Sequence, residues 1–374
     1  MIRKIVFITG TRADYGKIKP LLKAVEKQAN IELFVFVSGM HLLEKYGSTF
    51  NEVINDNYSN VYVDFSENYT GIMSFDLGNT ICNLTGYIKH INPDMIVVHG
   101  DRIDALAGAV VGALNNILVA HIEGGELSGT IDESIRHAIS KLAHIHLVCN
   151  KNAKQRLIQL GEEEKRIYVI GSPDIDIMLS ENLPCLEDAK KRYGIEFEKY
   201  AIMMYHPVTT EFSDIQIHIK ELVDALIESN HNYVVIYPNN DYGTEVILSE
   251  YERLKNKSNF RVFPSIRFEY FLTLLRNAQF MIGNSSAGIR ETGVYGIPAI
   301  DIGTRQTGRY LLNNSNIQHC NENKGEILSS INNIEKFRKK IYDFGKGKST
   351  DKFIELISSE DIWNCNLQKQ FVDM

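Results

Sequence analysis

The sequence predicts an α/β protein built from two doubly wound parallel sheets. Short apolar runs that end in Gly, His or Asn alternate with longer stretches of helical periodicity, the pattern of a parallel sheet covered by helices on both faces. The length of 374 residues exceeds what one ordinary core needs, and 44% hydrophobic residues are enough to form two. We therefore expect two Rossmann-like domains with a cleft between them.

The first half of the chain contains seven candidate strands. Each is a short apolar run followed by polar turn residues, and they lie at 2–9, 32–38, 60–63, 95–100, 117–122, 146–149 and 166–171. Helix-length segments separate them, which allows neighbouring strands to run parallel. The first domain is expected over residues 1–172.

The second half repeats this alternation without repeating the sequence. Its candidate strands lie at 200–206, 232–238, 260–264, 278–283 and 297–303. The rhythm pauses in the Gly/Pro-marked polar stretch 171–191, where we place the crossing between domains. The second domain is expected over 184–349, and the last segment, 350–374, is expected to return to the first.

Charge and composition exclude several classes of protein. The net charge of −7, with no block of Lys and Arg, argues against nucleic-acid binding. The N-terminal MIRKIVFITGTRADYG has too short an apolar run for a signal peptide or a membrane span, so a cytoplasmic protein is expected. The five cysteines are odd in number and far apart, which indicates neither a disulfide framework nor a zinc site.

Polar residues gather where the predicted strands end. The turns are GTRADYGK (10–17), HGDR (99–102), HIEGGE (121–126), HPVTTE (206–211), PNNDYG (238–243), GNSSAGIRE (283–291) and GTRQTGR (303–309). Ligands of open parallel sheets bind at the carboxyl ends of the strands, where turns expose N–H groups and the positive ends of helix dipoles. These turns are therefore the candidate site.

Three carboxylates are candidates for proton transfer. Asp101 and Glu123 each follow a predicted strand, and Asp132 lies in the first turn of a predicted helix. If they converge, with His206 facing them from the second domain, their pKa values would be pushed apart, so that one can hold a proton while another accepts one. Glu123 could equally be a buried acid satisfied by backbone amides, and Asp132 could merely complement the helix dipole.

Two other acids of the same stretch have simpler interpretations. Thr130 and Glu133 have the spacing of a capping box, which favours a structural role for Glu133. Glu126 is expected to be solvated.

Other turns suit an anion. Ser285, Ser286 and Gly288 stand at a predicted helix N-terminus, where free N–H groups can hold a diphosphate. Arg12 and Arg305, each within a GTR tripeptide, could add guanidinium contacts, or could form ordinary surface ion pairs. Glu291, further along the helix, is placed to accept hydrogen bonds from ribose hydroxyls.

Several motifs are discounted. GKGKST (345–350) resembles a P-loop, but Tyr342 stands where the first glycine is required. Asp174 and Asp176 are expected to be solvated, and His144 with His146 has no third ligand at a sensible spacing for a metal. No GxGxxG follows the first strand, so a dinucleotide cofactor is disfavoured, and neither cofactor nor metal is expected.

The sequence resembles the hydrolysing UDP-N-acetylglucosamine 2-epimerases of bacterial sialic acid synthesis and the epimerase half of the animal bifunctional enzyme. The likeness lies in the order and spacing of these turns and in the stretch HIEGGELSGTIDESIRHAISKLAH (121–144). The resemblance covers residues 2 to about 310. It implies the GT-B fold, a small-molecule nucleotide-sugar substrate and a homodimer or homotetramer. It also implies hydrolysis of UDP-N-acetylglucosamine to N-acetylmannosamine and UDP, by anti elimination to 2-acetamidoglucal followed by hydration.

The resemblance also assigns residues. Asp101, Glu123 and Asp132 match the catalytic carboxylates, and His206 matches an active-site histidine. The positions that match UDP contacts are Arg12, Arg102, Asn239, Ile266, Ser285, Ser286, Glu291 and Arg305. The animal enzyme has serine where this chain has Gly16, which puts a side-chain contact there in doubt.

Three rival functions stay open at this stage. Hydrolases acting on UDP-2,4-diacetamido-2,4,6-trideoxyglucose in legionaminic acid synthesis share almost all these motifs. Non-hydrolysing epimerases typically begin GTRPE, where this chain has GTRAD. A GT-B glycosyltransferase would bind a UDP-sugar at the same turns but would require an acceptor.

Overall fold

The computed structural model describes residues 2–65, 69–128, 130–310 and 315–373. The chain divides into two compact units. Unit 1 comprises Met1–Glu126, Asp132–Leu179 and Asp343–Met374, and unit 2 comprises Leu127–Ile131 and Ser180–Tyr342.

Unit 1 contains a seven-stranded sheet of order β3-β2-β1-β4-β5-β6-β7, in which every pair is parallel. Its strands are β1 (Arg3–Thr9), β2 (Ile31–Val37), β3 (Val61–Val63), β4 (Met95–His99), β5 (Leu118–Ile122), β6 (Ile145–Val148) and β7 (Ile167–Val169). All seven predicted strands are confirmed, with ends that differ by one or two residues. The strand order reverses between β1 and β4, and such a switch point opens a crevice for ligands.

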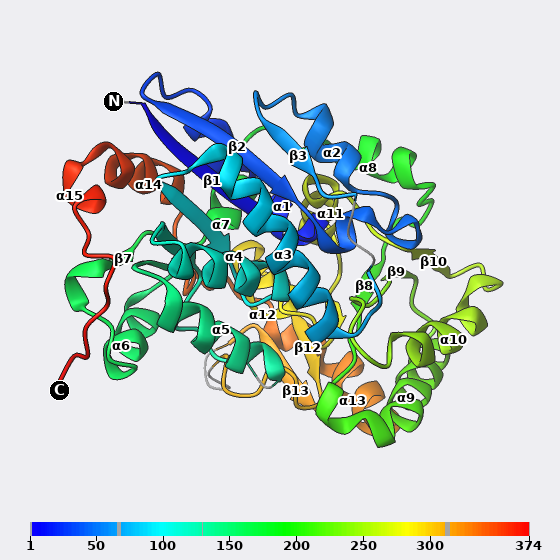
Figure 1. The fold of residues 1–374 in the computed structure, drawn as a ribbon. Helices are drawn as coiled ribbons and strands as arrows, with labels where there is room; N and C mark the ends of the chain where they lie inside the picture. Colours follow the sequence, from blue (N-terminus) through cyan, green and yellow to red (C-terminus); the bar gives the residue numbers. More distant parts are fainter. Residues whose placement is uncertain (1, 66–68, 129, 311–314, 374) are drawn as a thin grey trace. The chain divides into compact units, whose positions relative to one another are not determined.

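Helices cover both faces of this sheet (Figure 1). They are α1 (Arg12–Val25), α2 (Phe50–Asn55), α3 (Met73–Ile91), α4 (Ile103–Leu114), α5 (Ile131–Leu142), α6 (Lys151–Gln159), α7 (Pro173–Met178), α14 (Ser349–Ser358) and α15 (Glu360–Trp363). The alternation along β1 shows the two layers, because Ile5 and Phe7 join a core with α1 and α14, whereas Val6 and Ile8 join a core with α3, α4 and α5.

Unit 2 repeats the architecture with a six-stranded parallel sheet of order β10-β9-β8-β11-β12-β13. The strands are β8 (Ala201–Met204), β9 (Tyr233–Ile236), β10 (Phe260–Phe263), β11 (Met281–Gly283), β12 (Ala299–Ile302) and β13 (Ile317–Cys320). The helices are α8 (Leu186–Tyr193), α9 (Ile215–Glu228), α10 (Thr244–Lys255), α11 (Phe268–Arg276), α12 (Ala287–Tyr295) and α13 (Lys324–Asn333). The order again reverses between the first and fourth strands, β8 and β11. The edge strand β13 was not among the predicted strands.

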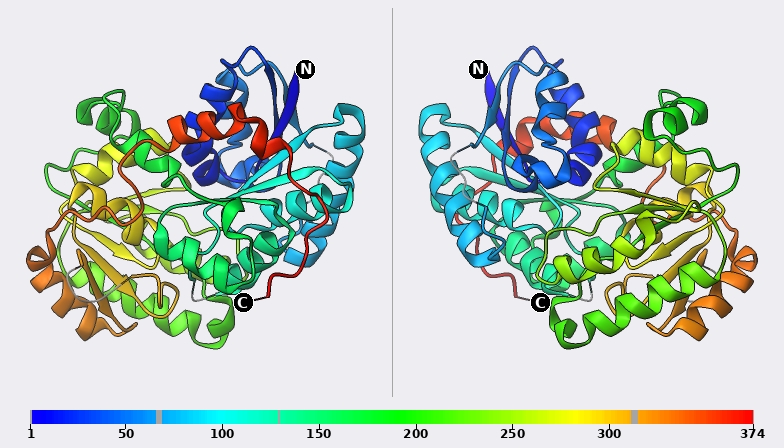
Figure 2. Two further views of the ribbon diagram at one scale, coloured as in Figure 1. Left: turned by 90° about the vertical axis from the view of Figure 1, so that its left-hand side faces the viewer. Right: turned by 90° about the vertical axis from the view of Figure 1, so that its right-hand side faces the viewer.

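The end of the chain packs on unit 1. Figures 1 and 2 show α14 beside α1, and Phe353 and Ile357 of α14 lie in the core that contains Phe7. Asp176 fixes the start of α14, because its carboxylate accepts the N–H groups of Ser349 and Thr350 at 3.0 and 2.7 Å. The N–H groups of the discounted GKGKST motif thus bind a carboxylate of the chain.

The prediction that Asp174 and Asp176 are solvated is therefore wrong. Asp174 is fully buried, with the ammonium of Lys17 3.3 Å from its carboxylate, and Asp176 is part-buried. Both acids belong to the short helix α7, which packs against α1 on the side of Asp174 and against the start of α14 at Asp176. Buried acids of this kind need a cation or a donor close by.

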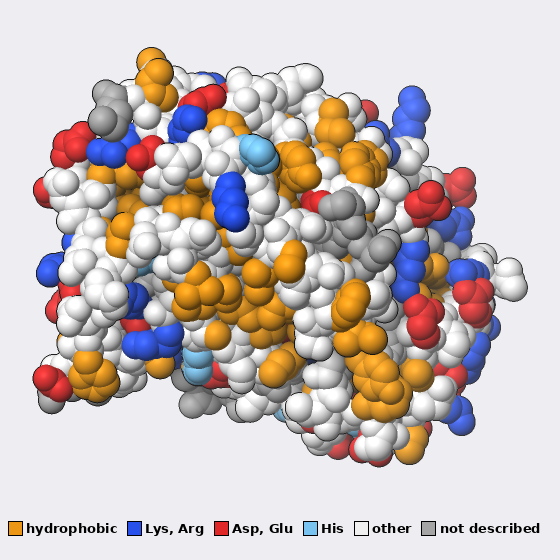
Figure 3. Space-filling model, viewed as in Figure 1, with side chains coloured by type: hydrophobic (Ala, Val, Ile, Leu, Met, Phe, Trp, Pro, Cys, Tyr) orange, Lys and Arg blue, Asp and Glu red, His pale blue; other side chains and the backbone are white. Residues whose placement is uncertain are grey.

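Apolar side chains gather over α3 and α4 on the face shown in Figure 3. Met73, Leu77, Ile81 and Leu106 are only partly buried there, and Leu114 at the end of α4 is 76% exposed. Within the described residues, no helix is long and apolar enough to cross a membrane.

Candidate active site

The predicted site residues of unit 1 lie at the carboxyl ends of β1, β4 and β5. Arg12 begins α1, Arg102 is the N-cap of α4, and Asp101 stands between β4 and α4. Arg12 forms an ion pair with Glu52. At least one of its contacts is therefore the ordinary ion pair that was the alternative to binding an anion. The turns after β1 and β4 flank the switch point of the sheet, where ligands of such sheets bind.

One buried guanidinium pairs with Asp101 and is influenced by the charges of the other candidate carboxylates. Arg136 of α5 is 3% exposed, pairs with Asp101 and donates from Nη1 to the carbonyl of Glu126 at 3.1 Å. Burial by itself would lower the pKa of Arg136, but Asp101, Glu126, Asp132 and Glu123 together raise it. All three candidate carboxylates therefore act on the same cation.

Glu123 has an unusual backbone. Its φ is +67°, in the left-handed region that residues other than glycine rarely adopt, and the residue is 6% exposed. Ser172 Oγ donates to Oε1 at 2.5 Å, and His99 Nε2 lies 3.4 Å from Oε2. Such backbone strain persists only where surrounding contacts impose it, and it is common at functional sites.

The turn that carries Asp101 is tied to α5 by a histidine. His121 Nε2 donates to the carbonyl of Gly100 at 2.8 Å, so Nδ1 is left to accept from Ser140 Oγ at 3.2 Å. Complete burial lowers the pKa of His121 to about 3, so the ring stays neutral. The imidazole thus links β5, the turn after β4 and α5.

Glu126 and Glu133 lie close in sequence to the candidate carboxylates. Glu126 is 5% exposed, so the prediction that it is solvated is wrong, because the glycine turn folds it back beside Arg136. The helix α5 begins at Ile131, and Glu133 lies 3.7 Å from His137 Nε2. The capping box of Thr130 and Glu133 stays a prediction.

The predicted residues of unit 2 follow five neighbouring strands in the same way. His206 follows β8, Asn239 follows β9, Ile266 follows β10, Ser285 and Ser286 follow β11, and Arg305 follows β12. Ser285 and Ser286 precede α12, and Glu291, which is 1% exposed, lies one turn into that helix. The first and fourth strands again mark the switch point, here between His206 and the two serines.

Asn284 holds this side of unit 2 together, a role that sequence reasoning missed. Its Oδ1 accepts the N–H of His206 at 2.6 Å, and its Nδ2 donates to the His206 carbonyl at 2.9 Å. The Asn284 carbonyl accepts from Arg305 Nη1 at 3.2 Å and from Gln306 Nε2 at 2.7 Å. This fully buried amide therefore fixes the turns after β8 and β12 against the turn after β11.

The imidazole of His206 has a defined orientation. Its Nδ1 accepts the N–H of Asn239 at 2.9 Å, so a neutral ring carries its proton on Nε2. Gly283 makes the close packing of these turns possible. Its φ is +132°, and a Cβ at this position would lie 2.0 Å from the carbonyl oxygen of Met204.

The structure also shows what groups of potential metal ligands do. His144 and His146 use ring nitrogens on the backbone of Val119 and Leu367 and on Glu162. In unit 2, ligand atoms of Glu211, His218 and Glu322 lie within 4.8 Å of one another, which suits a divalent cation in number and type. All three are partly exposed, and acidic groups often meet at a surface without a metal.

These turns and their spacing correspond to a known family. A family model described as UDP-N-acetylglucosamine 2-epimerase matches residues 23–358. The chain belongs to this family. A UDP-N-acetylglucosamine 2-epimerase from Neisseria meningitidis serogroup B is 50% identical over all of both chains. A hydrolysing UDP-N,N'-diacetylbacillosamine 2-epimerase from Legionella pneumophila is 33% identical over 99% of both.

Solved structures of the family confirm the fold. The structure of a Methanocaldococcus jannaschii UDP-GlcNAc 2-epimerase in complex with UDP-GlcNAc and UDP matches with a TM-score of 0.80 and 22% identity, covering 95% of this chain and 99% of that one. Together with the two parallel sheets, this likeness confirms the predicted α/β class with two Rossmann-like units of the GT-B type.

Proposed function

We propose that this epimerase-family protein is a hydrolysing UDP-N-acetylglucosamine 2-epimerase, which converts UDP-N-acetylglucosamine and water into N-acetylmannosamine and UDP. The observation that carries the chemistry is that Asp101 pairs with the buried guanidinium of Arg136, whose pKa is also raised by the charges of Asp132 and Glu123. The 50% identity to the Neisseria enzyme supports the sugar, and the hydrolysing relative from Legionella supports release of UDP. The resemblance of the motifs extends the proposal to sialic acid synthesis.

The reaction proceeds in two steps: C2 loses a proton in the first and gains one in the second. A base removes the C2 proton while the C1–O bond breaks and UDP leaves, which gives 2-acetamidoglucal. Water then adds across the double bond, with hydroxide at C1 and a proton at C2 on the face opposite to the original one. Both steps require one acidic group and one basic group close to the sugar ring.

The contacts favour different roles for the three carboxylates. The ion pair with Arg136 fixes the position of the Asp101 carboxylate, so Asp101 orients the sugar. Glu123 and Asp132 are both buried and exchange the C2 and hydration protons. The hydroxyl of Ser172, which donates to Glu123, fixes the direction in which that carboxylate acts.

The turns of unit 2 bind the nucleotide in this proposal. The N-terminus of α12 with Ser285 and Ser286 receives the diphosphate, Arg305 adds positive charge, and Glu291 accepts the ribose hydroxyls. Arg12, Arg102, Asn239 and Ile266 complete the UDP contacts. His206 presents Nε2–H to the substrate, because Asn239 occupies Nδ1. These donors stabilise the charge of departing UDP without a metal.

A second substrate has one specific observation in its favour. The Legionella relative acts on UDP-N,N'-diacetylbacillosamine, whose sugar is 2,4-diacetamido-2,4,6-trideoxyglucose. Its identity to this chain is 33%, against 50% for the relative that acts on UDP-GlcNAc, so the N-acetylglucosamine substrate is preferred.

The test is incubation of the enzyme with UDP-GlcNAc in D2O, followed by NMR of the products. We expect free N-acetylmannosamine with deuterium at C2, in equal amount to UDP. Epimerised UDP-sugar without free UDP would instead indicate a non-hydrolysing epimerase, and turnover only with an acceptor would indicate a glycosyltransferase. Parallel reactions with UDP-N,N'-diacetylbacillosamine decide between the sugars, and Glu123→Gln and Asp132→Asn serve as inactive controls.

We further propose that the protein is a homo-oligomer that uses the apolar face over α3 and α4. Most of α4 is buried within unit 1, but its partly buried Leu106 and Val110 and the exposed Leu114 leave its outward side apolar. Light scattering of the wild type and of Leu114→Lys tests this, with a smaller mass expected for the variant.

A further inference from the structure

The segment after α15 is bound to the end of α5 in unit 1. The ammonium of Lys369 donates to the carbonyls of Ser140 and Ala143 at 3.2 and 2.8 Å and to Glu162 Oε2 at 2.5 Å. His144 Nε2 also donates to the carbonyl of Leu367 at 3.0 Å. The last carbonyls of a helix have no partner within the helix, so a lysine is a favourable cap at this end.

Glu162 anchors the lysine from the other side. Its side chain is 2% exposed, forms an ion pair with Lys141 Nζ at 2.8 Å and accepts a hydrogen bond from His146 Nε2 at 3.0 Å, in addition to its contact with Lys369. Burial by itself would raise the pKa of Glu162, but these three partners lower it to about 2. The carboxylate is therefore ionised throughout the physiological range, and Lys369 is held between an anion and two helix carbonyls.

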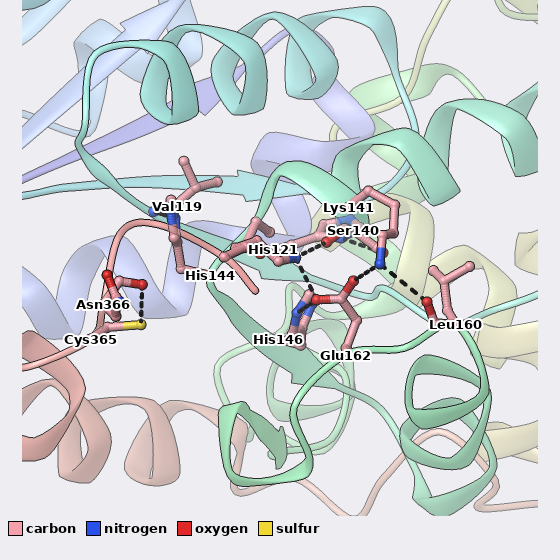
Figure 4. A network of polar contacts seen from close by, with 12 residues as sticks. Val119, His121, Ser140, Lys141, His144, His146, Leu160, Glu162, Cys365 and Asn366 are labelled. Atoms are coloured by element: carbon pink, nitrogen blue, oxygen red, sulfur yellow. Dashed lines mark hydrogen bonds and ion pairs between the residues drawn. The ribbon is translucent and has the colours of Figure 1, made fainter. Parts of the chain in front are cut away.

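The same helix end is connected to the turn that carries Asp101. Figure 4 shows Ser140, His121, His146 and Glu162 close together, and His121 lies opposite His146 in the pairing of β5 and β6. Ser140 donates through its hydroxyl to His121, and His121 donates to the carbonyl of Gly100, the residue before Asp101. Polar contacts therefore run without a break from Lys369 to the backbone of the catalytic turn.

Helix α5 is the element that these contacts fix. Ser140 of its last turn and Ala143 just beyond it supply the carbonyls to Lys369, and its first turns supply Asp132 and the Arg136 that holds Asp101. A rigid helix of 12 residues transmits a displacement of its last turn to its first. Misplacement of a catalytic group by about 1 Å can cost roughly a hundredfold in rate.

We propose that Lys369 is a positioning residue for the reaction: by clamping the C-terminal end of α5 to Glu162, it holds Asp132, Arg136 and the Asp101 turn in their working arrangement. This inference rests on the proposed function for its effect on turnover. The structural part of the proposal, that Lys369 orders the turn of Asp101, does not depend on the proposed function.

The experiment compares Lys369→Met with Lys165→Met in the full chain. Lys165 lines the same surface cavity of about 170 Å³ between the tail and the residues around Glu162, but its side chain is 72% exposed and pairs with Glu163. For Lys369→Met we expect kcat for UDP-GlcNAc to fall by roughly tenfold or more, with a smaller change in KM, because most of the proposed nucleotide contacts lie in unit 2 and only Arg12 and Arg102 lie in unit 1. Lys165→Met should change neither constant.

Hydrogen exchange provides the second readout. Amides of residues 99–106 should exchange faster in Lys369→Met than in the wild type and in Lys165→Met, and Glu162→Gln should reproduce the effect. A kcat for Lys369→Met equal to that of Lys165→Met, or unchanged exchange at residues 99–106, would overturn the proposal. If the wild type does not turn over UDP-GlcNAc, the proposed function fails, and the exchange experiment still decides whether the tail orders the catalytic turn.

Discussion

Removing the guanidinium of Arg136 tests the centre of the candidate site. In Arg136→Met the methionine fills much of the volume, but Asp101 loses this ion pair and the Glu126 carbonyl loses a donor. Breaking a buried ion pair by removing one partner costs about 3–5 kcal/mol. For a unit of this size, each kcal/mol lowers Tm by about 2–4 °C, so a fall of roughly 6–20 °C is expected.

The effect on catalysis should have a definite pH dependence. The positive charge of Arg136 favours the ionised forms of the nearby carboxylates, so without it they ionise only at a higher pH. The acidic limb of the kcat–pH profile should therefore move to higher pH. At neutral pH, kcat should fall by about a hundredfold, because Asp101 is no longer fixed.

The assay measures UDP release between pH 5 and 9 at a temperature where circular dichroism shows the variant folded. Arg156→Met is the matched control, since Arg156 Nη1 donates to the carbonyl of Gly125 at 3.2 Å, in the same turn, and its guanidinium is only part-buried. Calorimetric UDP affinity should be the same in all three proteins. The reasoning is refuted if Arg136→Met keeps the wild-type pH profile, or if Arg156→Met has an equal loss of kcat.

Three further predictions concern single contacts. Glu162 has a pKa of about 2 in the folded protein and near 4.5 in the unfolded chain, so the stability it contributes is present above pH 4.5 and is lost as the pH falls toward 2. In urea unfolding, the free energy of unfolding of the wild type should exceed that of Glu162→Gln by about 1 kcal/mol less at pH 3.5 than at pH 5. Gly283→Ala should lower Tm strongly, since its Cβ would lie 2.0 Å from the Met204 carbonyl oxygen. Gly288→Ala is the control and should fold normally, because the nearest neighbour of its Cβ is 3.8 Å away. Equal melting curves for the two variants would show that the close approach at Gly283 does not limit folding. Arg305→Met should weaken UDP binding by about tenfold in calorimetry while the protein still folds, and an unchanged affinity would remove Arg305 from the proposed pocket.

The strands were predictable because their signal is local. Runs such as Met95–His99 are fully buried in a parallel sheet, and their apolar character is visible without any tertiary information. The edge strand β13 lacks this signal, since part-exposed Gln318 and exposed His319 separate its buried ends, Ile317 and Cys320. Only its pairing with β12 makes it a strand.

The candidate site was predictable only in part, because partners of buried charges come from distant segments. Asp101, Glu123 and Asp132 could be selected by their places after strands, but Arg136 resembles a solvated helix residue until the fold buries it. One sequence signal was available: Arg136 lies four residues after Asp132, so both point to the same face of α5. Asn284 gave no such signal, since its contacts join three separate turns.

The contacts also explain why proton chemistry and nucleotide binding should separate in kinetic measurements. In unit 1, the left-handed backbone of Glu123 costs on the order of 1–3 kcal/mol, yet Ser172 and the pairing of its N–H with Leu147 hold it in place. None of these contacts involves a residue proposed to bind UDP. Changes around Glu123 should therefore alter kcat and its pH dependence, whereas changes around Asn284 should alter KM. An enzyme whose carboxylate variants raised only KM would show that the acids bind the sugar and do not move its protons.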